Sequence, residues 1–312
     1  MNIFIIILLI IVAIPVVGIL YEFAASQRDK MLYQNPPGEL VHVGGHDLHV
    51  LSMGERQANE PLIVLDAGIG ANALDWQKVQ PKIAEFAQVI SYDRAGYGWS
   101  HTSDIKRTPE RIVEELHELL NTMLLPPPYI LVGHSFGGIY ARLFAETYPD
   151  DIVGLVLVDS SHPEMLKATN TEPEIKRLKQ VRIFQRLGLL RLMLPRIFGR
   201  SNFLEGQALR TYLALNLMDN ANTLREAEPM FREGVVLENH VEVPLTVISR
   251  QRDEDIESEK NWTAYQDKLA TLSPDAVHIH TKSGSHWSAL AEPETVVDAI
   301  RDLFEKVKNQ ED

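Results

Sequence analysis

The residues best suited to chemistry lie in the segment Tyr129–Gly138, which reads Tyr-Ile-Leu-Val-Gly-His-Ser-Phe-Gly-Gly. Its first four residues are typical of a buried strand, and a helical pattern over Ile139–Tyr148 follows the turn at once. A Gly-x-Ser-x-Gly turn between a strand and a helix is the arrangement of a nucleophile elbow. The glycines permit a strained turn that exposes the hydroxyl, and the helix N-terminus favours developing negative charge. The segment therefore predicts that Ser135 is a nucleophile.

A serine hydroxyl needs a base within hydrogen-bond reach, and the base needs an acid to orient it. Loops that follow successive parallel strands meet at one edge of a sheet, whatever their distance in sequence. His286 follows the last expected strand, which makes it the predicted base. Asp253 follows the expected strand Pro244–Ser249 and is the predicted acid. Three carboxylates compete with it, namely the adjacent Glu254 and Asp255, and Asp159 after the strand Ile152–Val158.

The remaining site assignments concern the oxyanion and the substrate pocket. Two backbone N–H groups are expected to bind the oxyanion, those of Phe136 and of Ile69 in the turn Gly68-Ile69-Gly70. His134 abuts the nucleophile but points away from it, so we assign it with two tryptophans to the pocket; these three residues are His134, Trp99 and Trp287. No metal site is predicted, because the histidines of the first hairpin lack supporting carboxylate or cysteine spacing and are expected on its surface, namely His42, His46 and His49.

Short apolar runs alternate with helical patterns from Pro61 onward, which predicts an α/β fold with a mostly parallel sheet and right-handed crossovers. A hairpin over Leu40–Met53 precedes this alternation, and we expect about eight strands flanked by helices. The alternation stops between Met165 and His240, where several helices without a strand pattern predict an inserted cap. The expected division is an anchor at 1–26, a linker at 27–38, a core at 39–160 and 241–312, and a cap at 161–240.

The formal net charge of -13 argues against a nucleic-acid partner, and the absence of cysteine excludes disulfides and a cysteine nucleophile. The unbroken apolar run Ile3–Leu20 approaches the roughly 20 residues that cross a bilayer core. Only Asn2 precedes it, which favours an uncleaved single-pass anchor over a signal peptide, although Ala24-Ala25-Ser26 leaves processing open. Arg28 and Lys30 after the run favour a cytoplasmic catalytic domain.

The first half of the expected cap interleaves basic and apolar residues, which is unusual in an acidic protein. The basic residues are Lys176, Arg177, Lys179, Arg182, Arg186, Arg191, Arg196 and Arg200. Two interpretations stay open. The basic face contacts anionic membrane headgroups, or the apolar face covers the pocket while the arginines are solvated.

The sequence resembles the α/β-hydrolase family over about Leu40–Val307. The resemblance is carried by Gly133-His134-Ser135-Phe136-Gly137-Gly138, Asp93-Arg94-Ala95-Gly96-Tyr97-Gly98-Trp99-Ser100, Leu155-Val-Leu-Val-Asp159 and Gly284-Ser285-His286. It implies a Ser135–His286–Asp253 triad, an acyl-enzyme intermediate and a cap after the sixth strand. The usual His-Gly of the oxyanion turn is replaced by Ala67-Gly68, so Ile69 is placed by alignment. A serine at the elbow disfavours the dehalogenase and epoxide-hydrolase branches, which use aspartate there.

These observations predict a membrane-anchored serine hydrolase of carboxylesterase or lipase-like activity, with a hydrophobic ester as substrate and no metal or organic cofactor. An amidase, an aminopeptidase or a cofactor-free perhydrolase would use the same triad. A non-catalytic ligand-binding protein on the same scaffold is the alternative from another class, because a fold alone does not fix function.

Overall fold

The computed structural model describes all residues except 1–2, 169–170, 202, 219, 252–256 and 310–312. Its centre is an eight-stranded sheet in the order β1-β2-β4-β3-β5-β6-β7-β8, in which only the pairs β1–β2 and β2–β4 are antiparallel. The strands are β1 (Glu39–Val43), β2 (His46–Met53), β3 (Leu62–Asp66), β4 (Val89–Tyr92), β5 (Tyr129–His134), β6 (Ile152–Val158), β7 (Leu245–Ser249) and β8 (Ala276–His280). The predicted α/β fold with a mostly parallel sheet is confirmed.

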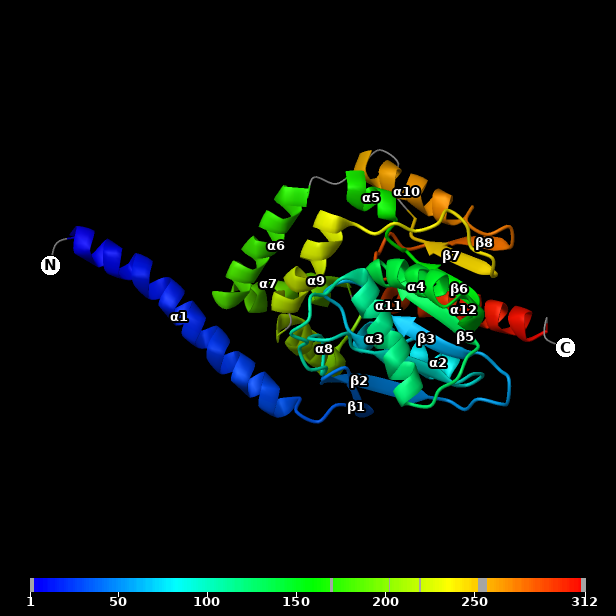
Figure 1. Cartoon of the computed structure of the whole chain (residues 1–312). Helices are drawn as coiled ribbons and strands as arrows, with labels where there is room; N and C mark the ends of the chain where they lie inside the picture. Colours follow the sequence, from blue (N-terminus) through cyan, green and yellow to red (C-terminus); the bar gives the residue numbers. More distant parts are fainter. Residues whose placement is uncertain (1–2, 169–170, 202, 219, 252–256, 310–312) are drawn as a thin grey trace.

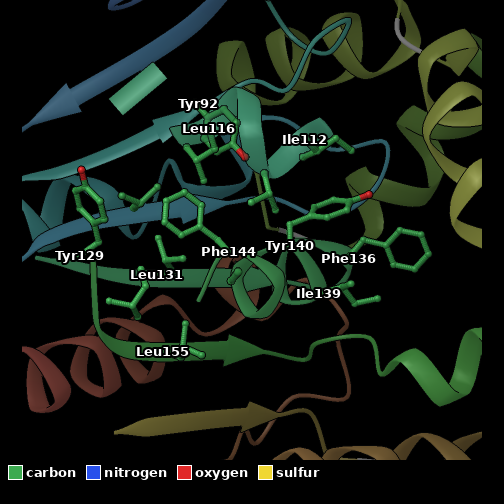
Figure 2. Packing of buried hydrophobic residues seen from close by; sticks show 14 of the residues in the cluster. Tyr92, Ile112, Leu116, Tyr129, Leu131, Phe136, Ile139, Tyr140, Phe144 and Leu155 are labelled. Atoms are coloured by element: carbon green, nitrogen blue, oxygen red, sulfur yellow. The ribbon is translucent and has the colours of Figure 1, made fainter. Parts of the chain in front are cut away.

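Helices cover both faces of this sheet, which is why its central strands are buried along their whole length and rich in apolar residues. The helices α3 (Pro109–Thr122) and α4 (Phe136–Thr147) pack on one face, and α2 (Gln80–Ile83) and α12 (Pro293–Lys308) on the other. Figure 2 shows Phe144, Tyr140 and Ile139 of α4 packed among apolar residues of the sheet and of α3. This packing fixes α4, and therefore the elbow at its N-terminus, against the sheet.

Helix ends follow their sequence signals where side chains can cap them. Thr108 accepts a hydrogen bond from the Arg111 amide at 3.3 Å, and Pro109 occupies the first position of α3. The shorter elements of the core are η1 (Ala73–Trp76), η2 (Pro149–Asp151), α10 (Glu257–Leu269) and α11 (Ser288–Ala291).

A helical insertion separates β6 from β7, as the interrupted alternation predicted. It comprises α5 (Pro163–Ala168), α6 (Thr171–Arg186), α7 (Leu189–Ser201), α8 (Gly206–Met218) and α9 (Asn220–Glu233). Figure 1 shows α6 to α9 gathered on the side of the molecule that faces α1. We call these five helices the cap.

The N-terminal helix α1 (Ile3–Leu32) begins with the long apolar run. Its most apolar stretch has a mean hydropathy of 3.5 and is not buried in the structure, so by length and composition it can cross a membrane. A signal sequence would meet the same criterion. Figure 1 shows its N-terminal end projecting away from the rest of the chain. The helix continues to Leu32 and so occupies part of the segment that we expected to be a linker.

The C-terminal half of α1 is held against the cap by Arg191. The Arg191 guanidinium donates to Glu22 at 2.8 Å, to Asp29 at 2.5 Å and to the Ser26 hydroxyl at 3.1 Å. The side chains of this ion pair are almost completely buried. Arg191 is therefore not part of the exposed basic face in which the sequence pattern placed it. These contacts also explain why α1 stays helical beyond its apolar run.

Replacing Arg191 with methionine is expected to destabilise the contact between α1 and the cap. The substitution removes the cation of the buried Glu22 carboxylate and leaves Asp29 with only the exposed Arg28, which should cost about 3 kcal/mol in free energy of unfolding. Thermal unfolding of the full chain in a neutral detergent measures the effect. Arg177→Met is the matched control, because the Arg177 side chain is 75% exposed on α6. Equal melting temperatures for the two variants would show that Arg191 contributes no net stability.

Candidate active site

Ser135 lies in the strained turn that the sequence predicted, between β5 and α4. Its backbone has φ 54° and ψ -119°, outside the regions that side-chain-bearing residues prefer. A Cβ on Gly133 would lie 2.4 Å from the Gly137 carbonyl oxygen, and one on Gly137 would lie 2.4 Å from the Asp66 carbonyl oxygen. The flanking glycines are thus required by backbone contact. The Ser135 carbonyl accepts from the Ser161 amide at 3.0 Å, which ties the turn to the end of β6.

His286 is paired with the carboxylate of Asp159. The imidazole Nδ1 lies 2.5 Å from Asp159 Oδ2, and the Asp159 side chain is completely buried. A neutral imidazole that donates from Nδ1 keeps Nε2 free to accept a proton. The Ser135 hydroxyl and His286 do not hydrogen-bond to each other in this structure, and such bonds often tighten only when substrate is bound.

Asp253, the predicted partner of His286, lies outside the described residues together with Glu254 and Asp255. The carboxylate that the structure places on His286 is the competitor, Asp159. It follows β6, whereas Asp253 would follow β7, and the two strands are neighbours in the sheet. Asp159 therefore already accepts the one hydrogen bond that His286 Nδ1–H can donate, and Asp253 is not needed for it.

Three further groups satisfy the Asp159 carboxylate. Trp262 donates its indole N–H to Oδ1 at 2.9 Å, the Arg250 amide lies 3.4 Å from Oδ1, and the Arg250 guanidinium lies 3.4 Å from Oδ2. Burial on its own raises the pKa of Asp159, but the hydrogen bond from His286 and the charges of His286 and Arg250 bring that pKa below its ordinary value. The carboxylate is consequently ionised at neutral pH and can stabilise a protonated His286.

His134 supports the backbone of His286 from the other side. Its Nε2 donates to the His286 carbonyl oxygen at 2.7 Å, and the two rings lie 4.7 Å apart. Burial, followed by the nearby charge of His286, lowers the pKa of His134 to about 3. His134 is therefore neutral at physiological pH, so it adds no positive charge beside a protonated His286.

The two predicted oxyanion donors flank the nucleophile. Phe136 begins α4, so its amide belongs to the group of N–H donors that have no acceptor within the helix. The amide of Ile69 has no hydrogen-bond acceptor among the described residues. Gly68, the residue before it, is so close to the elbow that an added Cβ would lie 3.1 Å from Ser135 Cβ. Both amides are thus available on the segments that adjoin Ser135.

Arg94 organises the turn that carries the Ile69 amide. Its guanidinium donates to the carbonyl oxygens of Ala67 and Gly68, each at 2.7 Å, and it also pairs with the Asp66 carboxylate. In a trans peptide the C=O and N–H groups point in opposite directions. By holding the Gly68 carbonyl, Arg94 therefore turns the Ile69 N–H away from itself. This role of Arg94 was not predicted from the sequence.

The cap closes the charge cluster around Arg94. Glu226 of α9 lies 3.2 Å from Arg94 Nε and accepts from the Tyr140 hydroxyl of α4 at 2.9 Å. Arg94 is 3% exposed and Glu226 is 1% exposed, so both charges depend on this pairing. The cap is thereby connected to the oxyanion turn and to the helix that begins at the nucleophile. A buried arginine requires an acidic partner, but no pattern in the sequence near Arg94 identifies that partner as Glu226.

The other predicted pocket residues occupy different places. The Trp287 ring lies 6.1 Å from that of His286 and lines a small void with His134. Trp99 packs 4.9 Å from His49, and its indole donates to the Tyr33 carbonyl at 2.7 Å. The structure thus brings Trp287 and His134 to His286 and ties Trp99 to the segment after α1. Their contact with substrate stays a prediction.

The prediction of surface histidines in the first hairpin is wrong for two of the three. His49 is fully buried and hydrogen-bonds to Asp93 at 2.7 Å, and His46 is buried 3.6 Å from Glu115. Only His42 is exposed. Their partners come from distant segments, which strand alternation cannot identify. In the part of the chain that the structure describes, no group of three or more candidate ligands could hold a metal ion.

Comparisons with known proteins identify the family of the chain. The pattern of the alpha/beta hydrolase family matches residues 63–299, which is more than half of the chain. The Bacillus subtilis protein YqjL is 28% identical over 78% of this chain and 83% of its own length. The 2-hydroxy-6-oxo-6-(2'-aminophenyl)hexa-2,4-dienoic acid hydrolase of Metapseudomonas resinovorans is 25% identical, over 88% of this chain and 92% of its own.

Similar solved structures share the fold at low sequence identity. An epoxide hydrolase from Bacillus megaterium superposes with a TM-score of 0.70 and 17% identity, covering 86% of this chain and all of its own. A thermophilic esterase from Thermogutta terrifontis has a TM-score of 0.67 and 20% identity, covering 87% of this chain and 99% of its own.

Glu226→Gln is expected to slow the reaction of Ser135 with a fluorophosphonate roughly ten-fold, because a weakened hold on Arg94 frees the oxyanion turn. The second-order labelling rate of the folded protein is the measurement. Glu228→Gln on the same helix is the matched control, since the ion pair of Glu228 among the described residues is with the exposed Arg232. If both variants react at the wild-type rate, Glu226 has a structural role only.

Proposed function

Because the chain belongs to the alpha/beta hydrolase family, we propose that it is a serine hydrolase that cleaves carboxylic esters through an acyl-enzyme on Ser135. The observation that carries this proposal is the His286–Asp159 hydrogen bond of 2.5 Å beside a serine elbow with φ 54°. A buried carboxylate that fixes an imidazole near a serine hydroxyl is the arrangement by which a serine is activated.

In the proposed acylation step, His286 Nε2 removes the Ser135 hydroxyl proton as Oγ attacks the ester carbonyl carbon. The C=O electron pair moves to the oxygen, which accepts hydrogen bonds from the Phe136 and Ile69 amides. Asp159 stabilises the imidazolium without taking its proton. Collapse of the intermediate breaks the bond to the alcohol oxygen, which receives the proton from His286.

Deacylation repeats these steps with water. His286 takes a proton from a water molecule as it attacks the acyl carbon, and the carboxylic acid leaves as Ser135 regains the proton. His134 keeps the His286 backbone in place during both steps, since it donates to the His286 carbonyl. Being neutral, it does not oppose the positive charge that forms on His286.

The position of α1 supports a hydrophobic ester as substrate. The turn between α6 and α7 packs on α1 where the apolar run ends, because a Cβ on Gly18 would lie 2.4 Å from the Leu187 carbonyl oxygen. Large apolar side chains near that turn are exposed, namely Ile183, Phe184, Leu189, Leu192 and Met193. We propose that α1 anchors the chain in a membrane and that this end of the cap faces the bilayer surface.

The substrate class is tested with matched p-nitrophenyl esters and p-nitroanilides of short and long acyl chains. We expect the esters to be hydrolysed faster than the anilides, with the highest kcat/KM for the longer chains. Ser135→Ala should abolish turnover. An epoxide or an anilide that is turned over faster than every ester would contradict ester hydrolysis as the main activity.

The identity of the acid is tested in the same assay with two asparagine variants. Asp159→Asn should lower kcat by roughly a thousand-fold, because the imidazole loses the partner that fixes its tautomer. Asp253→Asn is the matched control, and its kcat should stay within about three-fold of wild type if Asp253 plays no catalytic part. The reverse pattern would return the role to Asp253.

Membrane anchorage predicts that the full chain stays in the membrane pellet after washes with high salt and with alkaline carbonate. Both washes remove proteins held only by charge or by other proteins, whereas a spanning helix resists them. N-terminal sequencing of the same material should find residues before Gln27. A soluble chain that begins near Ser26 would instead identify the apolar run as a cleaved signal sequence.

A further inference from the structure

An open space lies between α1 and the cap, and Ser135 is not among the residues that line it. It has a volume of about 560 Å³, and its walls come from the C-terminal half of α1 and from α7 and α8. Its lining includes the apolar side chains of Leu32, Leu213 and Leu217 as well as arginines. A cavity with both surfaces suits an amphipathic ligand.

The charged residues that line the cavity have an excess of positive charge, which is unusual in a chain with a formal net charge of -13. Three arginines line the cavity, Arg28, Arg191 and Arg210, whereas the carboxylates of the cluster are Asp29 and the neighbouring Glu22. Arg191 engages both of these carboxylates.

The remaining two guanidiniums keep most of their donors for a ligand. The Arg28 guanidinium donates to Asp29 Oδ1 at 3.1 Å, while Arg191 binds the other oxygen of that carboxylate. The Arg28 side chain is 67% exposed. Arg210 has no hydrogen bond or ion pair with any described residue. Guanidinium groups bind phosphate oxygens in paired, bidentate fashion.

The cavity lies at the depth of lipid headgroups if α1 crosses the bilayer as proposed above. Its first residue, Tyr21, directly follows the apolar run, and tyrosine is typical of the boundary between hydrocarbon and headgroups. At 1.5 Å per residue, Arg28 lies about 12 Å beyond the end of the run. Arginine side chains are long enough to reach back toward the boundary.

We propose that this cavity binds the phosphate headgroup of an anionic membrane phospholipid. The phosphate lies between Arg28 and Arg210, and the glycerol and upper acyl chain lie against Leu213 and Leu217. The lipid therefore fills the space between α1 and the cap and stabilises their contact. This inference rests on the proposed membrane anchorage, but it does not depend on catalysis at Ser135.

The test is a titration of the full chain in a neutral detergent, with the melting temperature as the readout. Three probes are compared: dioleoyl phosphatidylglycerol, dioleoyl phosphatidylcholine and inorganic phosphate. Phosphatidylglycerol should raise the melting temperature in a saturable way. Phosphatidylcholine should bind at least ten-fold more weakly, because its choline cation opposes the arginines, and inorganic phosphate should have no saturable effect at the same concentrations.

Arg210→Gln should weaken phosphatidylglycerol binding about ten-fold without changing the melting temperature of the lipid-free protein, since Arg210 is exposed and no described residue pairs with it. Arg177→Gln is the matched control and should bind as wild type. Equal binding by Arg210→Gln and wild type, or an equal effect of phosphatidylcholine, would overturn the proposal. A saturable effect of inorganic phosphate equal to that of the lipid would replace the lipid with a free anion.

The same titration in Ser135→Ala separates this inference from the proposed enzyme activity. Ser135→Ala should bind the lipid as wild type does. Lipid binding by a wild-type chain that hydrolyses no ester would contradict only the catalytic proposal. Ester hydrolysis by a wild-type chain that shows no preference for phosphatidylglycerol would leave only the lipid site in error.

Discussion

The buried carboxylate of Asp159 sets the main constraint on this structure. An ionised carboxylate without solvent is costly unless several donors surround it. His286, Trp262 and Arg250 supply those donors, and they come from the loop after β8, from α10 and from the end of β7. Satisfying one charge therefore fixes three segments around the end of β6. Ser135 is held near the same end of β6, because its carbonyl accepts a hydrogen bond from the amide of Ser161, two residues beyond Asp159.

A second buried cluster connects the cap to this site. Arg94 joins Asp66 of β3 to Glu226 of α9, and it holds the backbone that presents the Ile69 amide. Burial, partly offset by the Arg94 charge, raises the pKa of Asp66 to about 6. The cluster thus holds two carboxylates around one guanidinium near neutral pH. We infer that α9 is a fixed part of the site, whereas the exposed apolar residues of α6 and α7 belong to the end of the cap that faces α1.

The fold could be predicted from sequence because its signals are local. The apolar strands, the glycines around Ser135 and the Thr108-Pro109 helix start each act within a few residues. The triad acid could not be chosen in this way, since carboxylates follow both β6 and β7, and the strands are neighbours. Only contacts between distant segments distinguish them. For the same reason, Glu226 was missed, Arg191 was placed on the exposed basic face, and His46 and His49 were expected at the surface.

The most direct test of the central claim, that Ser135 is an activated nucleophile, is to locate the adduct of a fluorophosphonate on the full chain. The protein is labelled, digested and analysed by mass spectrometry, with His286→Ala treated in parallel. We predict one phosphonyl group on the peptide that contains Ser135 in the wild-type protein, and almost none on that peptide in His286→Ala. Folded wild-type protein without an adduct, or with its adduct on another residue, would contradict the claim.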